Sequence, residues 1–359
     1  MKKIGFRVDT GNIVGSGHLM EIFSIYKNML DRFSFKPLFI TVGNDYIAEK
    51  LQQAGIVKES IYYFRKRVSA EELTEEEDIE ETAAILRDRE CEYLIMDLPN
   101  RTDEYYKGMT ERLKGSVAIL DNDNPTEIAP TLVVNFSITQ DADYYARLNN
   151  NYKYLIGPRY VPLNENILKH KAKESAEEVE TLFINQGGSD PYGLTRMIIS
   201  ALERTEGRFK VDILIGGLLK PKHRTEIKEK VAKSIKHEYQ LHENIPQEKV
   251  YTLMERADLA ISAAGNTLYE LAYFGVPSLM IAPRREFLRI TKDFSQSVGN
   301  IDLGIKDNIN ENILKEKISE LIGKAELRKA IAFKLKKLVD GRGTERICDR
   351  IYKVIFCEN

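Results

Sequence analysis

Short runs of apolar residues alternate with longer amphipathic stretches along the first part of the chain. Runs of this kind, flanked by polar or glycine-rich turns, are typical of buried strands. They lie at 4–9, 37–42, 93–98, 117–122 and 132–136. Helical spacing of apolar residues marks 19–30 and 70–88, and the acidic run 71–78 is expected to form a solvated helix start. This alternation predicts a parallel sheet with crossover helices.

The same alternation restarts in the second half of the chain. It follows a charged segment at 169–180 without Phe, Tyr or Trp, which we interpret as a hinge or exposed connector. The predicted strands are 181–185, 211–216, 258–262 and 277–282, and the predicted helices are 192–203, 222–234 and 266–274. We therefore expect two Rossmann-like βα domains facing a cleft, with ligands at the carboxyl ends of the strands. Their expected bounds are 1–165 and 166–359, and the last helix has room to pack back on the first domain.

Composition narrows the classes of partner. The 359 residues include 53 Lys and Arg against 55 Asp and Glu, a formal net charge of −2. Such a balance provides no electrostatic reason to expect a nucleic acid or an anionic membrane surface as partner. An anionic small molecule would have to be bound by local groups.

The cysteines and the hydropathy of the chain indicate in which cellular compartment we expect the protein. Three cysteines without a CxxC pair argue against a disulfide framework or a structural zinc site. His170, His223, His237 and His242 show no spacing suggestive of a metal site, and we expect neither a metal nor an organic cofactor. The N-terminus has no apolar signal region, and no uncharged apolar run approaches 18 residues. We expect a cytoplasmic protein without an integral membrane segment, and its oligomeric state stays open.

The first predicted strand is followed by a glycine-rich loop that ends in a histidine. Gly15 and Gly17 allow tight turns and close approach of a ligand, and His18 falls in the first turn of the next helix. A helix N-terminus disfavours the imidazolium form, so His18 is expected to be neutral and able to act as a general base. The spacing fits neither the GxGxxG fingerprint nor a Walker A loop, which argues against NAD and ATP.

Two later strands also end in loops suited to a phosphate. Gly187, Gly188 and Ser189 offer N–H and hydroxyl donors, and Asp190 can cap the helix that Pro191 would open. The second such loop contains Gly265, Asn266 and Thr267, followed one turn later by Glu270. A carboxylate there is suited to accept hydrogen bonds from a ribose diol while the donors hold a diphosphate. Together the loops predict a nucleotide site.

These motifs resemble those of the GT-B superfamily, the two-lobed enzymes of nucleotide-sugars. Within it the chain is most similar to the UDP-sugar hydrolases of pseudaminic acid biosynthesis and to related spore-coat polysaccharide proteins. The resemblance rests on 6–9, 15–20, 95–97, 120–123, 134–135, 157–160, 186–190, 262–270 and 275–277. Gly-x-Gly-His at 15–18 is the most specific of these motifs.

The resemblance implies a reaction and a division of roles. Water would attack the anomeric carbon of a UDP-linked diacetamido sugar and release UDP without a metal. His18 would activate the water, while Asp9 and Asp97 would shape the sugar site in the N-terminal domain. UDP would be held in the C-terminal domain. The residues implied there are Gly188, Ser189, Asn266, Thr267 and Glu270.

Departures from the family pattern leave two other functions open. Leu98 and Pro99 stand where the family has His-Tyr, Glu21 replaces a basic residue, and the pair Arg284-Arg285 lies where Asn-Gln is expected. A glycosyltransferase with a UDP-sugar donor would use His18 to deprotonate an acceptor hydroxyl. A non-catalytic relative would bind the nucleotide-sugar without turnover. Tyr105 and Tyr106 could replace the missing tyrosine, although a packed helical face is the favoured interpretation.

Overall fold

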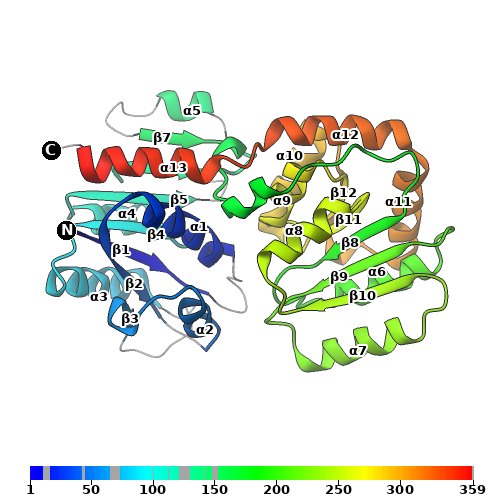
Figure 1. The fold of residues 1–359 in the computed structure, drawn as a ribbon, viewed down its shortest axis with the longest axis horizontal. Coiled ribbons are helices and arrows are strands. Elements are labelled where there is room, and N and C mark those ends of the chain that lie inside the picture. Colours follow the sequence, from blue (N-terminus) through cyan, green and yellow to red (C-terminus); the bar gives the residue numbers. More distant parts are fainter. Residues whose placement is uncertain are drawn as a thin grey trace. The chain divides into compact units, whose positions relative to one another are not determined.

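Two compact units make up the chain. The computed structural model describes residues 1–10, 17–42, 45–64, 73–99, 101–111, 113–120, 130–140, 142–147 and 153–357. The first unit combines Met1–Glu165 with Arg342–Asn359, and the second is Asn166–Gly341. The C-terminal segment thus belongs to the first unit, where helix α13 (Gly343–Tyr352), red in Figure 1, packs against α1 (Gly17–Arg32).

The first unit is built on a seven-stranded sheet in which every neighbouring pair is parallel. The strand order is β3-β2-β1-β4-β5-β6-β7. The strands are β1 (Lys2–Val8), β2 (Phe35–Thr41), β3 (Ile61–Tyr63), β4 (Tyr93–Asp97), β5 (Gly115–Leu120), β6 (Leu132–Asn135) and β7 (Lys153–Ile156). Helices α2 (Asp45–Gln53), α3 (Glu75–Asp88), α4 (Asp103–Thr110) and α5 (Ala142–Arg147) complete the unit.

Apolar stripes hold the helices of the first unit on its sheet. Along α1 the buried residues Ile22, Ile25, Tyr26 and Met29 recur at helical spacing. Tyr26 packs edge-on against Phe39, which in turn stacks on Phe6 of β1. Helices α3 and α4 pack against each other, and their apolar residues join those of β2 and β4 in a second buried cluster.

The second unit has a six-stranded parallel sheet with the order β10-β9-β8-β11-β12-β13. This is the strand order of the doubly wound dinucleotide-binding fold. In that fold, the second and third strands lie on one side of the first, and the fourth to sixth lie on the other. The strands are β8 (Thr181–Asn185), β9 (Lys210–Ile215), β10 (Glu238–Glu243), β11 (Leu259–Ala263), β12 (Ser278–Ala282) and β13 (Ile301–Ile305). The helices are α6 (Leu194–Glu203), α7 (Pro221–Ala232), α8 (Gln247–Arg256), α9 (Thr267–Phe274), α10 (Leu288–Val298), α11 (Glu311–Gly323) and α12 (Ala325–Leu338).

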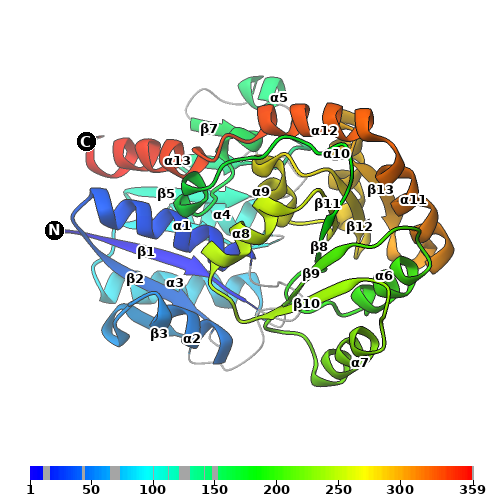
Figure 2. The same ribbon diagram turned by 45° about the vertical axis from the view of Figure 1, so that its right-hand side comes forward.

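The helices of the second unit form two groups. Helix α6 contacts α7 and α11, whereas α9 contacts α8 and α12. Figure 2 shows the sheet of this unit with α6 and α7 apart from α8 and α9. Helix α9 ends at Gly275, which takes a left-handed backbone conformation with φ 69°. That conformation favours glycine, so residue 275 sets where the helix stops.

The sequence pattern predicted every interior strand and missed every edge strand. The predicted runs correspond to β1, β2, β4, β5 and β6 and to β8, β9, β11 and β12. The missed strands β3, β7, β10 and β13 are the outer strands of the two sheets. In β10 and β13 most residues are only partly buried. Edge strands pair with one neighbouring strand only, so they can be short, like β3 and β7, or contain charged residues, like β10 and β13.

The acidic run before α3 was expected to be solvated, and this is wrong for one of its residues. Thr74 caps the helix, and its side chain and that of Glu77 form a reciprocal capping box. Asp78, one residue later, is fully buried.

None of the helices in the described part of the chain combines the length and the apolar character that a membrane span requires.

Candidate functional site

In the first unit the strand order reverses between β1 and β4, with β2 and β3 on one side and β5 to β7 on the other, and three of the predicted site residues lie at this switch point. In open parallel sheets, ligands bind outside the carboxyl ends of the strands at this switch point. Asp9 directly follows β1, Asp97 is the last residue of β4, and His18 is the second residue of α1. Gly17 opens α1, whereas Gly15 lies outside the described residues.

His18 and Asp97 form a close pair. The Nδ1 atom of His18 lies 2.6 Å from Oδ1 of Asp97, and the residues are 8% and 1% exposed. A carboxylate at Nδ1 selects the tautomer that carries its proton there, which leaves the lone pair on Nε2. The same carboxylate stabilises the imidazolium that forms when Nε2 takes a proton. The pair therefore has the geometry of a histidine base with its orienting carboxylate.

Glu21 also lies beside His18 and Asp97. In the sequence it stood out only because the family pattern has a basic residue at that position. It lies one helical turn after His18, and its side chain is 3% exposed. One ligand atom each from His18, Glu21 and Asp97 lies within 4.8 Å of the other two. The spacing His-x-x-Glu was visible in the sequence, but Asp97 is 79 residues away from His18. Only the pairing of β1 with β4 brings it near.

Asp9 is held by protein groups on both carboxylate oxygens. Its Oδ2 accepts a hydrogen bond of 2.7 Å from Arg7, and its Oδ1 accepts bonds from Thr41 Oγ1 (3.1 Å) and the Val42 N–H (2.8 Å). Burial raises the pKa of Asp9, but Arg7 and these hydrogen bonds outweigh burial and hold the pKa below its ordinary value. Asp9 thus joins β1 to the end of β2, and direct sugar contact by this carboxylate stays a prediction.

Arg7 also carries the buried charge of Asp78. Its Nε and one terminal nitrogen bond to the two oxygens of Asp78 at 2.9 and 2.8 Å, and Arg101 lies 3.3 Å from the same carboxylate. Arg7 and Asp78 are 0% exposed, so the acidic residue expected in solvent is an internal counter-ion. Two arginines and two aspartates, Asp9 being the second, make this network formally neutral.

The two candidate tyrosines of α4 are packed in the interior. Tyr105 is 0% and Tyr106 is 1% exposed, and both belong to the apolar cluster beneath α3 and α4. Their rings meet edge to face with centroids 5.6 Å apart. This agrees with the packed helical face favoured from the sequence.

The second unit has its own switch point, between β8 and β11, and both predicted nucleotide loops start there. Asn185 at the end of β8 donates from Nδ2 to Oγ1 of Thr267 at 3.0 Å. Gln186 donates from Nε2 to the Ile261 carbonyl of β11 at 3.0 Å. These bonds hold the two loops together across the switch point.

The loop 187–190 is organised differently from the prediction. The Gly187 N–H donates to Asn185 Oδ1 at 2.9 Å, and the Gly188 carbonyl accepts from the Leu218 N–H at 2.9 Å. The prediction that both glycine N–H groups are open to a phosphate is therefore wrong for Gly187. A Cβ on Gly216 would lie 2.1 Å from the Gly188 carbonyl oxygen, so this close backbone approach requires glycine.

Asp190 caps α6, as expected, but the helix starts later than predicted. Its carboxylate accepts from the Leu194 N–H at 2.8 Å and the Thr195 N–H at 3.0 Å. Pro191 therefore lies in the preceding turn rather than at the first helical position. Since Asp190 occupies these helix N–H groups, the start of α6 has little capacity left for a phosphate. Ser189 is partly exposed in the same turn.

Helix α9 presents a different end. It begins at Thr267, just after Gly265 and Asn266, and the side chain of Asn266 does not cap it. The Leu268 and Tyr269 N–H groups donate to the Gly265 and Asn266 carbonyls at 3.0 Å each, so this end of the helix is closed by backbone bonds rather than by a carboxylate. A helix N-terminus of this kind attracts anions through its N–H groups and its dipole. Glu270 lies in the first turn, where its carboxylate accepts a 2.8 Å hydrogen bond from Gln247 of α8. Burial raises the pKa of Glu270 to about 7, although hydrogen bonds from Tyr251 and Gln247 oppose this.

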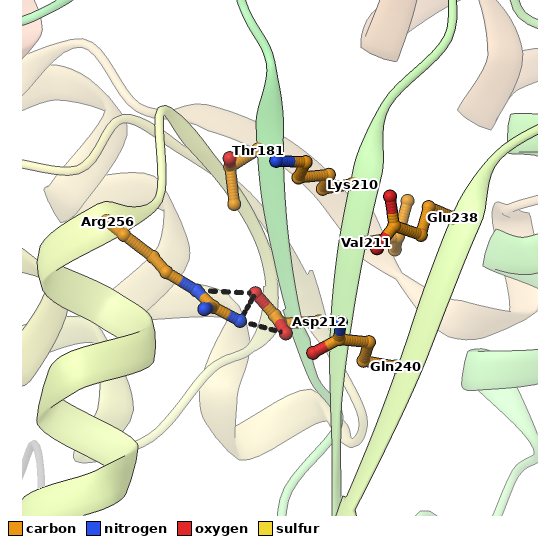
Figure 3. A pocket seen from close by; sticks show the side chains of 7 residues that line it. All are labelled: Thr181, Lys210, Val211, Asp212, Glu238, Gln240 and Arg256. Carbon is orange, nitrogen blue, oxygen red and sulfur yellow. Dashed lines mark hydrogen bonds and ion pairs between the residues drawn. The ribbon is translucent and has the colours of Figure 1, made fainter.

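A polar cavity lies at the opposite, amino-terminal ends of the strands of the second unit. About 190 Å³ in volume, it is lined by Thr181, Lys210, Val211, Asp212, Glu238, Gln240 and Arg256. Figure 3 shows Arg256 reaching from α8 to the buried Asp212, which it meets at 2.5–2.9 Å. His242 Nε2 lies 2.6 Å from the same carboxylate. The charges here compensate one another, so we interpret this cavity as structural.

Comparisons with known proteins place the fold. No model of a known protein family matches the chain. The spore coat polysaccharide biosynthesis protein SpsG of Bacillus subtilis (strain 168) is 24% identical over 270 residues, which cover 73% of this chain and 76% of that protein. The uncharacterized protein MJ1062 of Methanocaldococcus jannaschii is 23% identical over 294 residues, 78% of this chain and 55% of its own length.

Solved structures resemble the whole chain. MurG of Acinetobacter baumannii has a TM-score of 0.67 at 13% identity and covers 98% of this chain and 99% of its own. The calicheamicin glycosyltransferase CalG4 has a TM-score of 0.67 at 11% identity over 99% of each chain. The UDP-GlcNAc 2-epimerase of Neisseria meningitidis, bound to UDP-GlcNAc, has a TM-score of 0.65 at 12% identity over 98% of this chain and 100% of its own. With its two parallel-sheet α/β units, the chain has a GT-B-like fold.

Proposed function

We propose that this protein is a UDP-sugar hydrolase of surface polysaccharide biosynthesis. The observation that carries the proposal is the His18–Asp97 pair at 2.6 Å, at the switch point of the first sheet. The sequence similarity to a spore coat polysaccharide biosynthesis protein and the fold shared with UDP-sugar enzymes support the pathway and the substrate class.

The chemistry follows from the pair. The oxygen of a water molecule attacks the anomeric carbon of the sugar, and the bond from that carbon to the diphosphate oxygen breaks. His18 Nε2 takes the proton from the water, and Asp97 at Nδ1 stabilises the imidazolium that results. UDP leaves as an anion, so its departure needs no proton when N–H donors and a helix dipole stabilise the diphosphate.

The nucleotide is assigned to the second unit. The start of α9, with Gly265, Asn266 and Thr267, is proposed to hold the diphosphate, because the start of α6 is already bonded to Asp190. Glu270, one turn later, would accept hydrogen bonds from the two ribose hydroxyls. Gly187, Gly188 and Ser189 would border the nucleotide rather than supply most of its donors.

A glycosyltransferase is the second candidate. The fold is shared with the calicheamicin glycosyltransferase CalG4, and the same base could deprotonate an acceptor hydroxyl instead of water. Arg284 and Arg285 follow β12, at the carboxyl edge of the second sheet. Arg284 pairs with Glu286 at 2.9 Å, whereas Arg285 is exposed and makes no ion pair with any described residue. Arg285 is therefore the better placed of the two to contact a phosphate.

Product analysis tests the proposal. UDP binding is measured first by calorimetry, and the protein is then incubated with UDP-N-acetylglucosamine and with UDP-linked diacetamido sugars, with and without a sugar acceptor. We expect UDP and free sugar without any acceptor. Release that requires an acceptor would indicate the transferase, and binding without release would indicate a non-catalytic protein. Absence of UDP binding would contradict the nucleotide site itself.

The ionisation of Glu270 predicts a pH dependence for UDP binding. With a pKa of about 7, the carboxyl is largely protonated at pH 6 and largely ionised at pH 8. Ribose hydroxyls that donate to the carboxylate favour its ionised form, so binding releases protons near pH 7. We expect the affinity for UDP to fall about tenfold from pH 8 to pH 6, as the ionised fraction does.

Calorimetry between pH 6 and pH 8 in buffers of different ionisation enthalpy measures both the affinity and the protons released. The variant Glu270→Gln should bind UDP more weakly at pH 8 and lose the part of the pH dependence that Glu270 contributes, because glutamine does not titrate. The terminal phosphate of UDP also titrates near pH 6, so its contribution should remain in the variant. Glu206→Gln, an exposed carboxylate of the same unit just beyond the end of α6, is the control and should keep the wild-type profile. An identical pH profile for Glu270→Gln and the wild type would contradict a ribose contact by Glu270.

A further inference from the structure

We propose that His18, Glu21 and Asp97 form a binding site for one divalent transition-metal ion, with zinc as the best-matched ion. The first observation is the donor set itself. One imidazole and two carboxylates place a nitrogen and two oxygen atoms within 4.8 Å of one another, and all three residues are buried. Imidazole and carboxylate ligands together are typical of zinc and related first-row metals.

The second observation is that the donors come from elements whose positions are set by the fold. His18 and Glu21 lie on the same side of the first turn of α1, three residues apart. Asp97 is anchored by the pairing of β4 with β1 and β5. The three residues meet at the carboxyl edge of the sheet, at the switch point of its strand order. Ligands are bound at this point in folds of this kind.

The third observation concerns charge. The ligand set contains the carboxyl groups of Glu21 and Asp97, whose negative charge when ionised a divalent cation would compensate. Buried charges are stabilised when they are paired or coordinate a metal.

Small side-chain movements suffice to form the site. A tetrahedral zinc ion holds its ligand atoms about 3.3 Å apart, because each bond is about 2.0–2.1 Å long. The contact of 2.6 Å between His18 and Asp97 would open slightly, and the longer separations in the cluster would shorten. Rotation about the side-chain bonds of Glu21 can bring its carboxylate closer to the other two ligand atoms. Three protein ligands would leave the fourth position of the metal for water.

Metal binding would change what His18 can do. Zinc on Nδ1 would require the tautomer with the ring proton on Nε2, so the metal-bound His18 would have no lone pair there to act as the proposed base. Zinc is therefore expected to inhibit UDP release without acceptor, and a chelator is expected to restore it. This consequence rests on the proposed function, whereas the binding test below does not.

The experiment is calorimetric titration of zinc into the full chain after dialysis against a chelator, without nucleotide, at pH 7.5. We expect one bound ion per chain and, for Glu21→Gln, a loss of affinity of at least about tenfold. Glu270→Gln in the second unit is the matched control and should bind zinc like the wild type. Unchanged UDP affinity of Glu21→Gln would show that its second unit is folded, and circular dichroism checks the whole chain.

A second measurement uses only the wild type. X-ray absorption at the zinc edge should show a single imidazole among otherwise oxygen ligands, as the cluster requires. Failure to bind zinc, equal affinity in Glu21→Gln, or a site with two or more imidazoles would overturn the inference. None of these results depends on whether UDP binds or is released, so failure of the metal site is distinguishable from failure of the proposed function.

Discussion

Replacing His18 with alanine is expected to lower UDP release without acceptor by about two to four orders of magnitude, because the reaction loses its general base. Asp97→Asn should lose activity over a similar range, since an amide at Nδ1 no longer selects the tautomer with a free lone pair on Nε2. Release of UDP is followed by chromatography, and UDP affinity is measured in parallel. Both variants should bind UDP like the wild type, because the nucleotide is assigned to the other unit.

His170→Ala is the matched control for this pair. His170 also meets a carboxylate, that of Glu255 at 2.8 Å, but it belongs to the second unit. Its activity should remain within about twofold of the wild type, because His170 is assigned neither to the base nor to the nucleotide site. Since its ring packs against Tyr251 and Phe274, circular dichroism checks that the variant is folded. Equal activity of His18→Ala and His170→Ala would contradict the assignment of His18 as the base.

Replacing Arg7 with methionine is expected to lower the free energy of unfolding of the first unit by about 3–5 kcal/mol. Methionine keeps much of the volume but leaves Asp9 and Asp78 buried without the guanidinium that bonds to both. The measurement is urea unfolding followed by circular dichroism, with and without UDP. UDP should shift only the transition of the unit that binds it, which identifies the transition of the first unit.

The variant Arg32→Met is the control for Arg7→Met. It tests whether the loss of stability comes from the burial of the ion pairs or simply from removing an arginine. Arg32 is also in the first unit and pairs with Asp349, but this ion pair is exposed to solvent. Exposed pairs contribute at most about 1 kcal/mol, so Arg32→Met should change the free energy of unfolding far less than Arg7→Met. Similar losses for the two variants would show that Arg7 is not a buried counter-ion of the kind described.

Interior and edge strands differed in how well the sequence predicted them. Interior strands such as β4 and β12 are buried along their whole length, and their apolar runs Tyr-Leu-Ile-Met and Leu-Met-Ile-Ala are strong local signals. The edge strands β3, β7, β10 and β13 are held by a single neighbouring strand. A partly exposed sequence such as Glu238–Glu243 contains charged residues that indicate a strand only when β9 is known to lie beside it.

The same difference applies to the candidate site. Glycine-rich turns and the position of His18 after the first strand are local features, and they located the ends of the strands at which both switch points lie. The burial of Asp78 was not predictable, since its acidic neighbours are exposed or partly exposed and its partner Arg7 is 71 residues away. Nor did local sequence show that Asn185 takes up the Gly187 N–H.

By itself, the sequence determined the alternation of strands and helices, the interior of both sheets and the loops at which ligands are expected. These depend on hydrophobic period and turn chemistry over a few residues. The tertiary structure decided which side chains from distant segments meet: Asp97 with His18, Arg7 with Asp78, and Gln247 with Glu270. Such pairs form because parallel pairing and helix packing bring strand ends and helix starts together, and no local pattern records which charges will share a buried site.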